Sequence, residues 1–415
     1  MKEFDFHLLY SWIFLSIISL YSNNLNSMGY SLVDSVKDSI RRGDIKKLEK
    51  SKIWQPEVYA EYMRLDFDDQ STPLHFAVCH FDKGGKLCEN IAAIELLLNN
   101  KVDPNVCEFK GMATPLHFAL SAQAVNLLVN AGASVNKGEQ QGLTPLHSAV
   151  RRGRLEVVKA IIDHKAEVNA ETYNHETPLF FAQSYDILDT LLQNGACVNH
   201  YSKSGSKPIH EIIKSSENPL SLVVRLLSSG NSPNELKKDN EPIIVTALKH
   251  RRFDVVTFLV GQKLDIKEFI GKPHDPLRLG AIELGARKEH KNTPNHEKYK
   301  EYQDYYKATG LILERLFQED SDFAAHSFKD ETGNTFLHWA VRFGKEKIVD
   351  NLLELGADIT KISNGKTPII LARELGQENI YQKLSCYHEK RATELFDAIM
   401  QKAQMACSSR GSSSA

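Results

Sequence analysis

The sequence has little of what marks a disulfide-bonded, metal-binding or strongly charged protein. Its 415 residues include only six cysteines and three tryptophans, and 51 Lys+Arg nearly balance 53 Asp+Glu. Six cysteines are too few for a disulfide framework in a chain this long. No two of them form the C-x-x-C pair of zinc and redox sites. The near-neutral charge argues against a dedicated nucleic-acid binder. We therefore expect no metal, no cofactor and no nucleic-acid partner.

Long apolar runs are also scarce, and the one that matters lies at the start of the chain. Leu8–Tyr21 is 14 residues long, which is short for a membrane span of about 20 residues and closer to a signal-peptide core. Acidic Glu3 and Asp5 precede it, however, and no small-residue cleavage site follows. A signal, an anchor, an incidental apolar tail and a true start at Met28 remain open. We expect a cytoplasmic protein, with secretion or membrane tethering through this segment as the alternative.

What the chain does have is a repeated pattern. Thr-Pro-Leu-His or a variant opens each unit, two apolar helical runs follow, and Gly-Ala-x-Val-Asn or part of it closes several units, as at Gly132, Gly195 and Gly356. Successive openings are 42, 30, 33, 30, 34, 34, 60 and 32 residues apart. The nine openings begin at Thr72, Thr114, Thr144, Thr177, Lys207, Glu241, Asp275, Thr335 and Thr367.

The motifs and their period of about 33 residues resemble the ankyrin repeat. The resemblance covers most of residues 70–384, and Gly142–Asn169 matches the family consensus best. The opening Thr suits a helix N-cap, the Pro after it suits the first helical position, and later glycines suit helix ends. One unit cannot bury its apolar face alone, so units must stack. The resemblance implies an all-α solenoid of helix-turn-helix units with short β-hairpin turns.

This register predicts the organisation of the chain. We expect an apolar segment at 1–30, a helical N-terminal cap at 31–70, six repeats at 71–270, a divergent repeat with an insertion at 271–330, two repeats at 331–384, and a C-terminal helix with a disordered tail at 385–415. Instead of two or three separate domains, the repeats would then form one array whose length is set by their number.

Irregular spacings indicate where units depart from the pattern. The first excess fits a loop at Phe81–Glu89, and the two spacings of 30 imply tightened helix connections at Ser121–Gln123 and Ser184–Asp186. In the spacing of 60, Asp275–Arg287 fits a first helix. Gly310–Phe317 fits a second helix that extends backwards over the tyrosines of the insertion.

Five histidines in the opening motifs invite a metal or catalytic interpretation, which we reject. Metal ligands converge within about 2 Å of one ion, whereas packed helices lie about 8–10 Å apart. We expect each histidine to tie its Thr turn to a neighbour; they are His75, His117, His147, His210 and His338. Gly365-Lys366-Thr367 lacks the rest of a P-loop. We assign no catalytic, cofactor-binding or metal-binding residue, and expect no enzyme.

Two kinds of residue are candidates for binding a partner. Basic residues at the turn between helices would suit an acidic partner, and aromatic side chains beside arginine are common in binding hot spots. By the family register, the hairpin tips are the second kind. The candidates are Arg151, Arg152, Trp339, Arg342 and Phe343, and at the tips Lys110, Gln140, Gln141, Tyr173, Asn174 and Lys203.

The resemblance implies a non-catalytic scaffold, monomeric, that binds proteins through a concave face of tips and first helices, and that would target host proteins if it comes from a virus or a host-associated bacterium. One alternative is an enzyme with its activity in the 275–330 interruption, although 27 extra residues are few for a catalytic domain. Another is a scaffold tethered to a membrane through Leu8–Tyr21. The partner's identity does not follow from the sequence.

Overall fold

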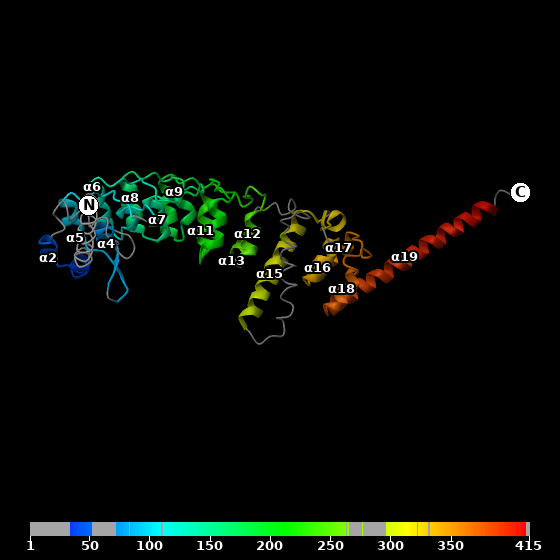
Figure 1. The fold of residues 1–415 in the computed structure, drawn as a ribbon. Coiled ribbons are helices and arrows are strands. Elements are labelled where there is room, and N and C mark those ends of the chain that lie inside the picture. The colour runs from blue at the N-terminus through cyan, green and yellow to red at the C-terminus, as the bar shows by residue number, and fades with distance from the viewer. Residues whose placement is uncertain are drawn as a thin grey trace, which may run out of the picture. The chain divides into compact units, whose positions relative to one another are not determined.

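The chain forms two compact units, Met1–Gly230 and Asn231–Ala415. The sequence predicted one array, and the boundary between the units lies within the block 71–270. Predictions for Leu8–Tyr21, Lys110 and nearly all of Asp275–Arg287 lie outside the described residues. The computed structural model (Figure 1) describes residues 34–51, 72–82, 84–108, 111–262, 264, 276, 296–321, 323–330 and 333–411.

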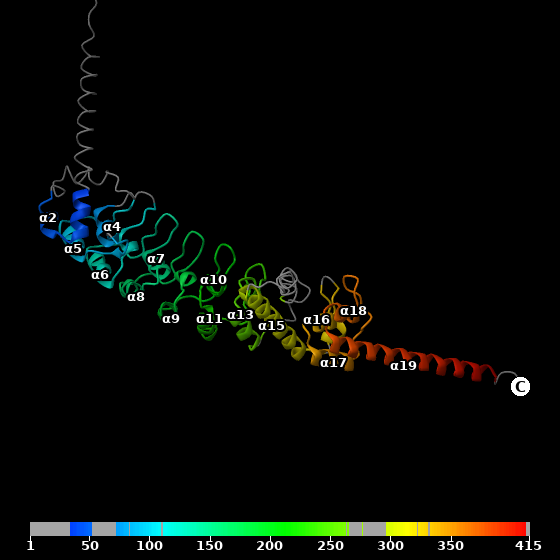
Figure 2. The same ribbon diagram turned by 90° about the horizontal axis from the view of Figure 1, so that it is seen from below.

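The first unit contains five repeats, each with a short first helix and a longer second one. Residues 34–42 are helical and precede α2 (Ile45–Glu49), which packs against the second helix of the first repeat. Second helices of successive repeats pack on one another, and so do the first helices. The connections between repeats form a row along one edge (Figure 2). In chain order the pairs are α4 (Pro73–Val78) with α5 (Ile91–Asn99), η2 (Pro115–Phe118) with α6 (Ala122–Asn130), α7 (Pro145–Arg151) with α8 (Leu155–Asp163), η3 (Pro178–Phe181) with α9 (Tyr185–Gln193), and α10 (Pro208–Ser215) with α11 (Pro219–Ser228).

The opening Thr and His form a buried cap that also joins neighbouring repeats. In the third repeat, the backbone N–H of Thr144 donates to Nδ1 of His147 at 3.1 Å. Because Nδ1 accepts this bond, we assign the ring proton to Nε2, which donates to the carbonyl of Glu176 in the next repeat at 3.0 Å. Burial lowers the pKa of His147 to about 4, so the ring is neutral near pH 7. The sequence expectation of a structural histidine is confirmed here.

The same cap recurs in three other repeats. His75 donates to the carbonyl of Ala113, and His117 to that of Leu143, each at 3.0 Å. Burial lowers the pKa of both histidines to about 4. In the second unit, His338 bonds the carbonyl of Lys366 at 3.2 Å. This recurring hydrogen bond sets the distance between consecutive repeats, because a buried ring nitrogen and a buried carbonyl each need a partner.

Where a repeat is short, the first helix itself is reduced. The repeats with spacings of 30 have a single 3₁₀ turn in this place, η2 and η3, of four residues each. Ser121 and Ser184 then cap α6 and α9 by accepting bonds from Ala124 and Ile187. The tightened connections are where the sequence placed them, but the residues removed come mostly from the first helix. First helices of six to eight residues therefore alternate with single turns along this unit.

The excess in the first repeat is folded. It lies between α4 and α5, as predicted, but it is an antiparallel hairpin instead of an irregular loop. The strands are β1 (His80–Phe81) and β2 (Leu87–Cys88), and the hairpin projects from the helices (Figure 1). Asp82 orders its turn by accepting bonds from the amides of Gly84 and Lys86 at 2.8 Å.

The second unit contains α12 (Ile243–Lys249), α13 (Phe253–Val260), α15 (His296–Glu319), a π-helical turn η6 (Phe323–Ser327), α16 (Phe336–Arg342), α17 (Glu346–Glu354), α18 (Pro368–Glu374) and α19 (Glu378–Gly411). Helix α15 packs against α13 and includes the predicted backward extension of Gly310–Phe317. Isolated bridges Lys329–Thr335 and Ser363–Lys366 close hairpin turns. The all-α repeat architecture with short hairpin turns is confirmed.

Helix α19 differs from what the sequence predicted. It runs 34 residues without a break, whereas the second helices of the regular repeats have eight to ten and α15 has 24. The expected boundary between 384 and 385 thus falls inside one helix. Residues 408–411, assigned to a disordered tail, are helical, and 412–415 lie outside the described residues. The apolar side chains of Ile380 and Leu384 bury the start of α19 against the repeat.

Candidate partner-binding site

The hairpin tips of the first unit are tied together through their backbones. The amide of Gln140 donates to the carbonyl of Gly111 at 2.7 Å. The amide of Tyr173 donates to Gln141 at 3.0 Å, and that of Lys203 to Asn174 at 2.7 Å. Each tip is also closed internally, for example by the bond from the amide of Glu139 to the carbonyl of Leu143. Four successive tips therefore form one hydrogen-bonded row.

The predicted tip residues present their side chains to solvent from this row. Gln140, Gln141, Asn174 and Lys203 are exposed, and Tyr173 has 71% of its surface accessible. Lys110 lies outside the described residues. The structure thus brings five of the six predicted tip residues together on neighbouring tips.

Gly142 lets two tips approach closely. A Cβ at this position would lie 2.9 Å from the amide nitrogen of Tyr173 and 3.0 Å from its ring, and the backbone φ is +78°. Any other residue would push the tip that carries Tyr173 away or strain its own backbone. The exposed aromatic ring is therefore held on a fixed backbone.

Sequence reasoning missed three residues that join two of these tips. Glu171 accepts a 2.6 Å hydrogen bond from Nδ1 of His175, and its other oxygen lies 3.6 Å from Nε2 of His200. The hydrogen bond to His175 holds the pKa of Glu171 below its usual value. Met112 on an earlier tip, 56% exposed, was missed as well. Only the tip register could have suggested them, because they share no motif.

The basic turn after α7 divides into two roles. The guanidinium of Arg152 donates to the carbonyl of His117 at 2.8 Å and lies 5.0 Å from the centre of the Phe118 ring. It therefore covers the shortened first helix η2 of the preceding repeat, and burial lowers its pKa. Arg151, Arg152 and Arg154 are all exposed. Of the predicted pair, Arg151 is presented to solvent, whereas Arg152, although it also keeps surface in solvent, is tied to the preceding repeat.

The aromatic candidates of the second unit need correction. Trp339 and Phe343 are 2% exposed, and their rings stack with centres 5.8 Å apart. The indole N–H of Trp339 donates to Asp330 at 3.0 Å. Arg342 is half-buried and lies 5.7 Å from the Trp339 ring. Trp339 and Phe343 stand four residues apart on the buried side of α16 and its end, so neither ring can reach a partner.

Among the described residues, no group of three or more His, Cys, Asp or Glu side chains is arranged to hold a metal ion. Within the same residues, no helix combines the length and apolarity that a membrane span needs. Neither observation bears on Leu8–Tyr21, which is not described.

Comparisons with known proteins agree with this architecture. A family model described as ankyrin repeats (3 copies) matches residues 85–172, 116–202 and 306–394. A putative ankyrin repeat protein of Acanthamoeba polyphaga mimivirus is 24% identical over 63% of the chain and 35% of its own length. The mouse B-cell lymphoma 3 protein homolog is 31% identical over 28% of the chain and 26% of its own length.

Alpha-latrocrustotoxin-Lt1a of Latrodectus tredecimguttatus is 33% identical over 34% of the chain. The chain spans 11% to 35% of the lengths of these three relatives. Ankyrin repeats generally mediate protein–protein interaction, and the family is typically non-enzymatic. The matched repeats, the recurring Thr–His caps and the stacked helix pairs together identify the chain as an ankyrin-repeat protein.

Proposed function

We propose that this chain is a non-catalytic scaffold that binds a protein partner through the tips and first helices of its first unit. One observation carries the proposal, namely the row of tips joined by backbone hydrogen bonds. The side chains on this row are exposed, and the fold does not need them for packing. A surface that is already ordered loses little conformational entropy on binding, which leaves more of the contact energy as affinity.

The chemistry of the row suits a partner with both apolar and polar contacts. Tyr173 offers a large ring at the centre of the row, and tyrosine is among the residues enriched in binding hot spots. Lys203 and Gln140 on the flanking tips supply hydrogen-bond donors. Arg151 at the end of α7 adds a positive charge for an acidic group of the partner.

Affinity purification with mass spectrometry on the full chain tests the proposal. The double variant Tyr173→Ala/Lys203→Ala should lose the main partner or retain it at least about tenfold more weakly. The matched control is Tyr185→Ala, which removes a 48% exposed tyrosine from the start of α9. If the double variant retains every partner at wild-type levels, the tips are not the binding site.

Three more specific hypotheses about this scaffold are also proposals. The hypothesis that it targets a host protein would be supported if the partner is captured from an extract of host cells and not from an extract of the source organism. Membrane tethering through Leu8–Tyr21 predicts that full-length protein fractionates with membranes while a chain starting at Met28 does not. If the full-length protein and the chain starting at Met28 fractionate equally, the tethering proposal is wrong and the cytoplasmic scaffold remains the proposal. An activity in the 275–330 interruption has less support, because α15 in its described part packs against α13 as a repeat helix does.

A further inference from the structure

The position three residues after the opening Thr is the point where a repeat meets its successor. Residues at this position are at most 3% exposed in seven described repeats. In four of them a histidine ring bonds a carbonyl of the following repeat. Ile370 holds the position in the repeat built from α18 and α19, and there the side chain is 46% exposed. The face of this repeat on which a following repeat would stack is therefore open and apolar. The seven buried residues are His75, His117, His147, Phe180, His210, Ile244 and His338.

Helix α19 extends the same open face. Its inner side faces α17, since Lys383 donates to Asp350 at 2.7 Å and Asn379 to Glu346 at 3.2 Å. Ile399 is 16 residues beyond Lys383, so at about 100° per residue it points about 160° away from that side. Around Ile399 lies an exposed apolar stripe. Its members are Leu395, Phe396, Ile399 and Met400, with 65%, 62%, 56% and 46% of their surfaces accessible.

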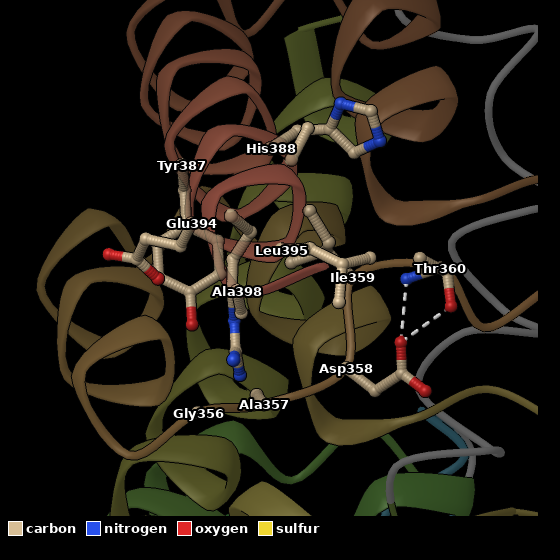
Figure 3. A pocket seen from close by; sticks show the side chains of 12 residues that line it. Gly356, Ala357, Asp358, Ile359, Thr360, Tyr387, His388, Glu394, Leu395 and Ala398 are labelled. Carbon is tan, nitrogen blue, oxygen red and sulfur yellow. Dashed lines mark hydrogen bonds between the residues drawn. The ribbon is translucent and has the colours of Figure 1, made fainter. Parts of the chain in front are cut away.

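The other side of this part of α19 is lined differently. Tyr387 and Arg391 border a cavity of about 710 Å³ between α19 and the 356–360 loop (Figure 3). Phe396 follows Tyr387 by nine residues, about two and a half turns, and so lies on the opposite side of the helix. Of the four stripe residues, only Leu395 also borders that cavity.

We propose that this outer face, formed by Ile370 and the α19 stripe, binds the same face of a second copy of the chain. Ile370 stands at the position where the other repeats meet their successors, so the natural complement of this face is the apolar face of another repeat. A second copy supplies such a face, and a symmetric contact covers both at once. Exposed apolar side chains gathered on one surface mark an interaction site.

The charges around the face permit this pairing. Glu374 in α18 is already paired with Lys366 of the same chain. Next to the stripe in the sequence, Glu389, Lys390, Arg391 and Glu394 are two acidic and two basic residues. A face dominated by one sign would repel its copy, whereas this one has no such excess. A helix that packs against nothing over many turns is only marginally stable in water, and packing against a second α19 would stabilise it.

Analytical ultracentrifugation of the full chain at micromolar concentration tests the proposal. Wild-type protein should sediment as a dimer, and Phe396→Lys/Ile399→Lys should raise the dissociation constant at least about tenfold, because a symmetric interface contains each change twice. Ile370→Lys should weaken the dimer as well. The matched control is Phe81→Lys, which replaces an equally exposed phenylalanine of the first unit, 62% in both cases, and should leave the dimer intact.

Circular dichroism and thermal unfolding of each variant separate lost association from lost folding. The substituted side chains are exposed, so helical signal and melting temperature should match those of the wild type at concentrations where it is monomeric. Wild-type protein that stays monomeric throughout this range overturns the proposal, even if another protein binds the stripe. An unchanged dimer in the α19 double variant or in Ile370→Lys also overturns it.

Discussion

The third repeat of the first unit and the first described repeat of the second unit solve the same problem with different chemistry. Both must satisfy buried polar groups where a first helix begins. In the third repeat, neutral Thr144 and His147 do this by capping α7 through three hydrogen bonds. In the other, Glu241 stands where the Thr would be and is 4% exposed. It accepts hydrogen bonds from Lys237 at 2.9 Å, from Thr246 at 2.8 Å and from Lys249.

The opening of a repeat can thus be filled by a neutral or by a charged buried side chain, provided that its hydrogen bonds are made. Burial alone would raise the pKa of Glu241, but its hydrogen bonds to Lys249, Lys237 and Thr246 outweigh burial and lower it to about 2. The histidine caps respond oppositely, since they must stay uncharged. The histidine caps and the hydrogen-bonded Glu241 should therefore fail in separate ranges of pH.

The largest expected effect is acid destabilisation of the first unit. The pKa of His75, His117 and His147 is about 4 in the folded chain and 6.5 for a free histidine. Between these values the unfolded chain binds more protons, so stability is complete above about pH 6.5 and falls as pH drops towards 4. Each histidine can account for up to about 3 kcal/mol. Hydrogen exchange with mass spectrometry at pH 7 and pH 4 should show protection lost at residues 114–181.

The comparison is sharpest if residues 241–249 behave differently in the same experiment. Glu241 has a lowered pKa, so its contribution is present above about pH 4.5 and is lost only as pH falls through about 2. After correction for the intrinsic exchange rate, protection there should persist at pH 4. The variant His147→Gln should reduce the steepness of the loss in the first unit. Equal loss in both segments would show that the caps do not set the acid response.

A smaller effect is expected when the carboxylate of Glu241 is neutralised. Glu241→Gln leaves Lys237 and Lys249 without their counter-charge, and Lys237 is only 21% exposed. We expect a loss of about 2 kcal/mol in the free energy of unfolding. This is less than the loss of about 3–5 kcal/mol that is typical when a fully buried ion pair is broken, because both lysines can turn towards water. Urea denaturation monitored by circular dichroism measures the loss, and Glu354→Gln on the exposed end of α17 is the control. A loss equal to the control's would mean that the buried network contributes nothing.

The smallest effect should come from a similar pair at the surface. Lys366 and Glu374 form an ion pair in which the side chains are 41% and 47% exposed. Exposed pairs contribute about 0–1 kcal/mol, so Lys366→Ala should change stability by less than about 0.5 kcal/mol in the same urea titration. A change as large as that of Glu241→Gln would contradict burial as the cause of the difference.

Much of this fold could be predicted because the opening motif of each repeat fixes the positions of the residues that follow. Thr144, Pro145 and Gly153 fix where α7 begins and ends, and Gly142 fixes the tip before it. The tip residues Gln140 and Tyr173 follow from that register alone. A helix after residue 385 was predicted, but not that it continues the second helix of the last repeat without a break, because the alternation of charged and apolar residues in α19 suits a helix of either length.

The site was less predictable because side-chain reach is not periodic. Glu171 contacts His200 across two tips, and nothing in the spacing of the repeats signals a pair of that kind. Trp339 and Phe343 were misplaced for a different reason. They lie four and eight residues after Thr335, and positions four apart share one face of a helix. Ser148, four residues after Thr144, is buried as well, so the register already marked this face as interior.

The alternation of first helices has a consequence for the size of a partner. Full helices α4, α7 and α10 are separated by the single turns η2 and η3. Packed helices lie about 8–10 Å apart, so the full helices recur about every 16–20 Å. The surface formed by the first helices therefore has a period of two repeats, whereas the row of tips has a period of one. A ligand that reads the tips meets every repeat, but one that reads the helix ends can find its matching contact only at every second repeat.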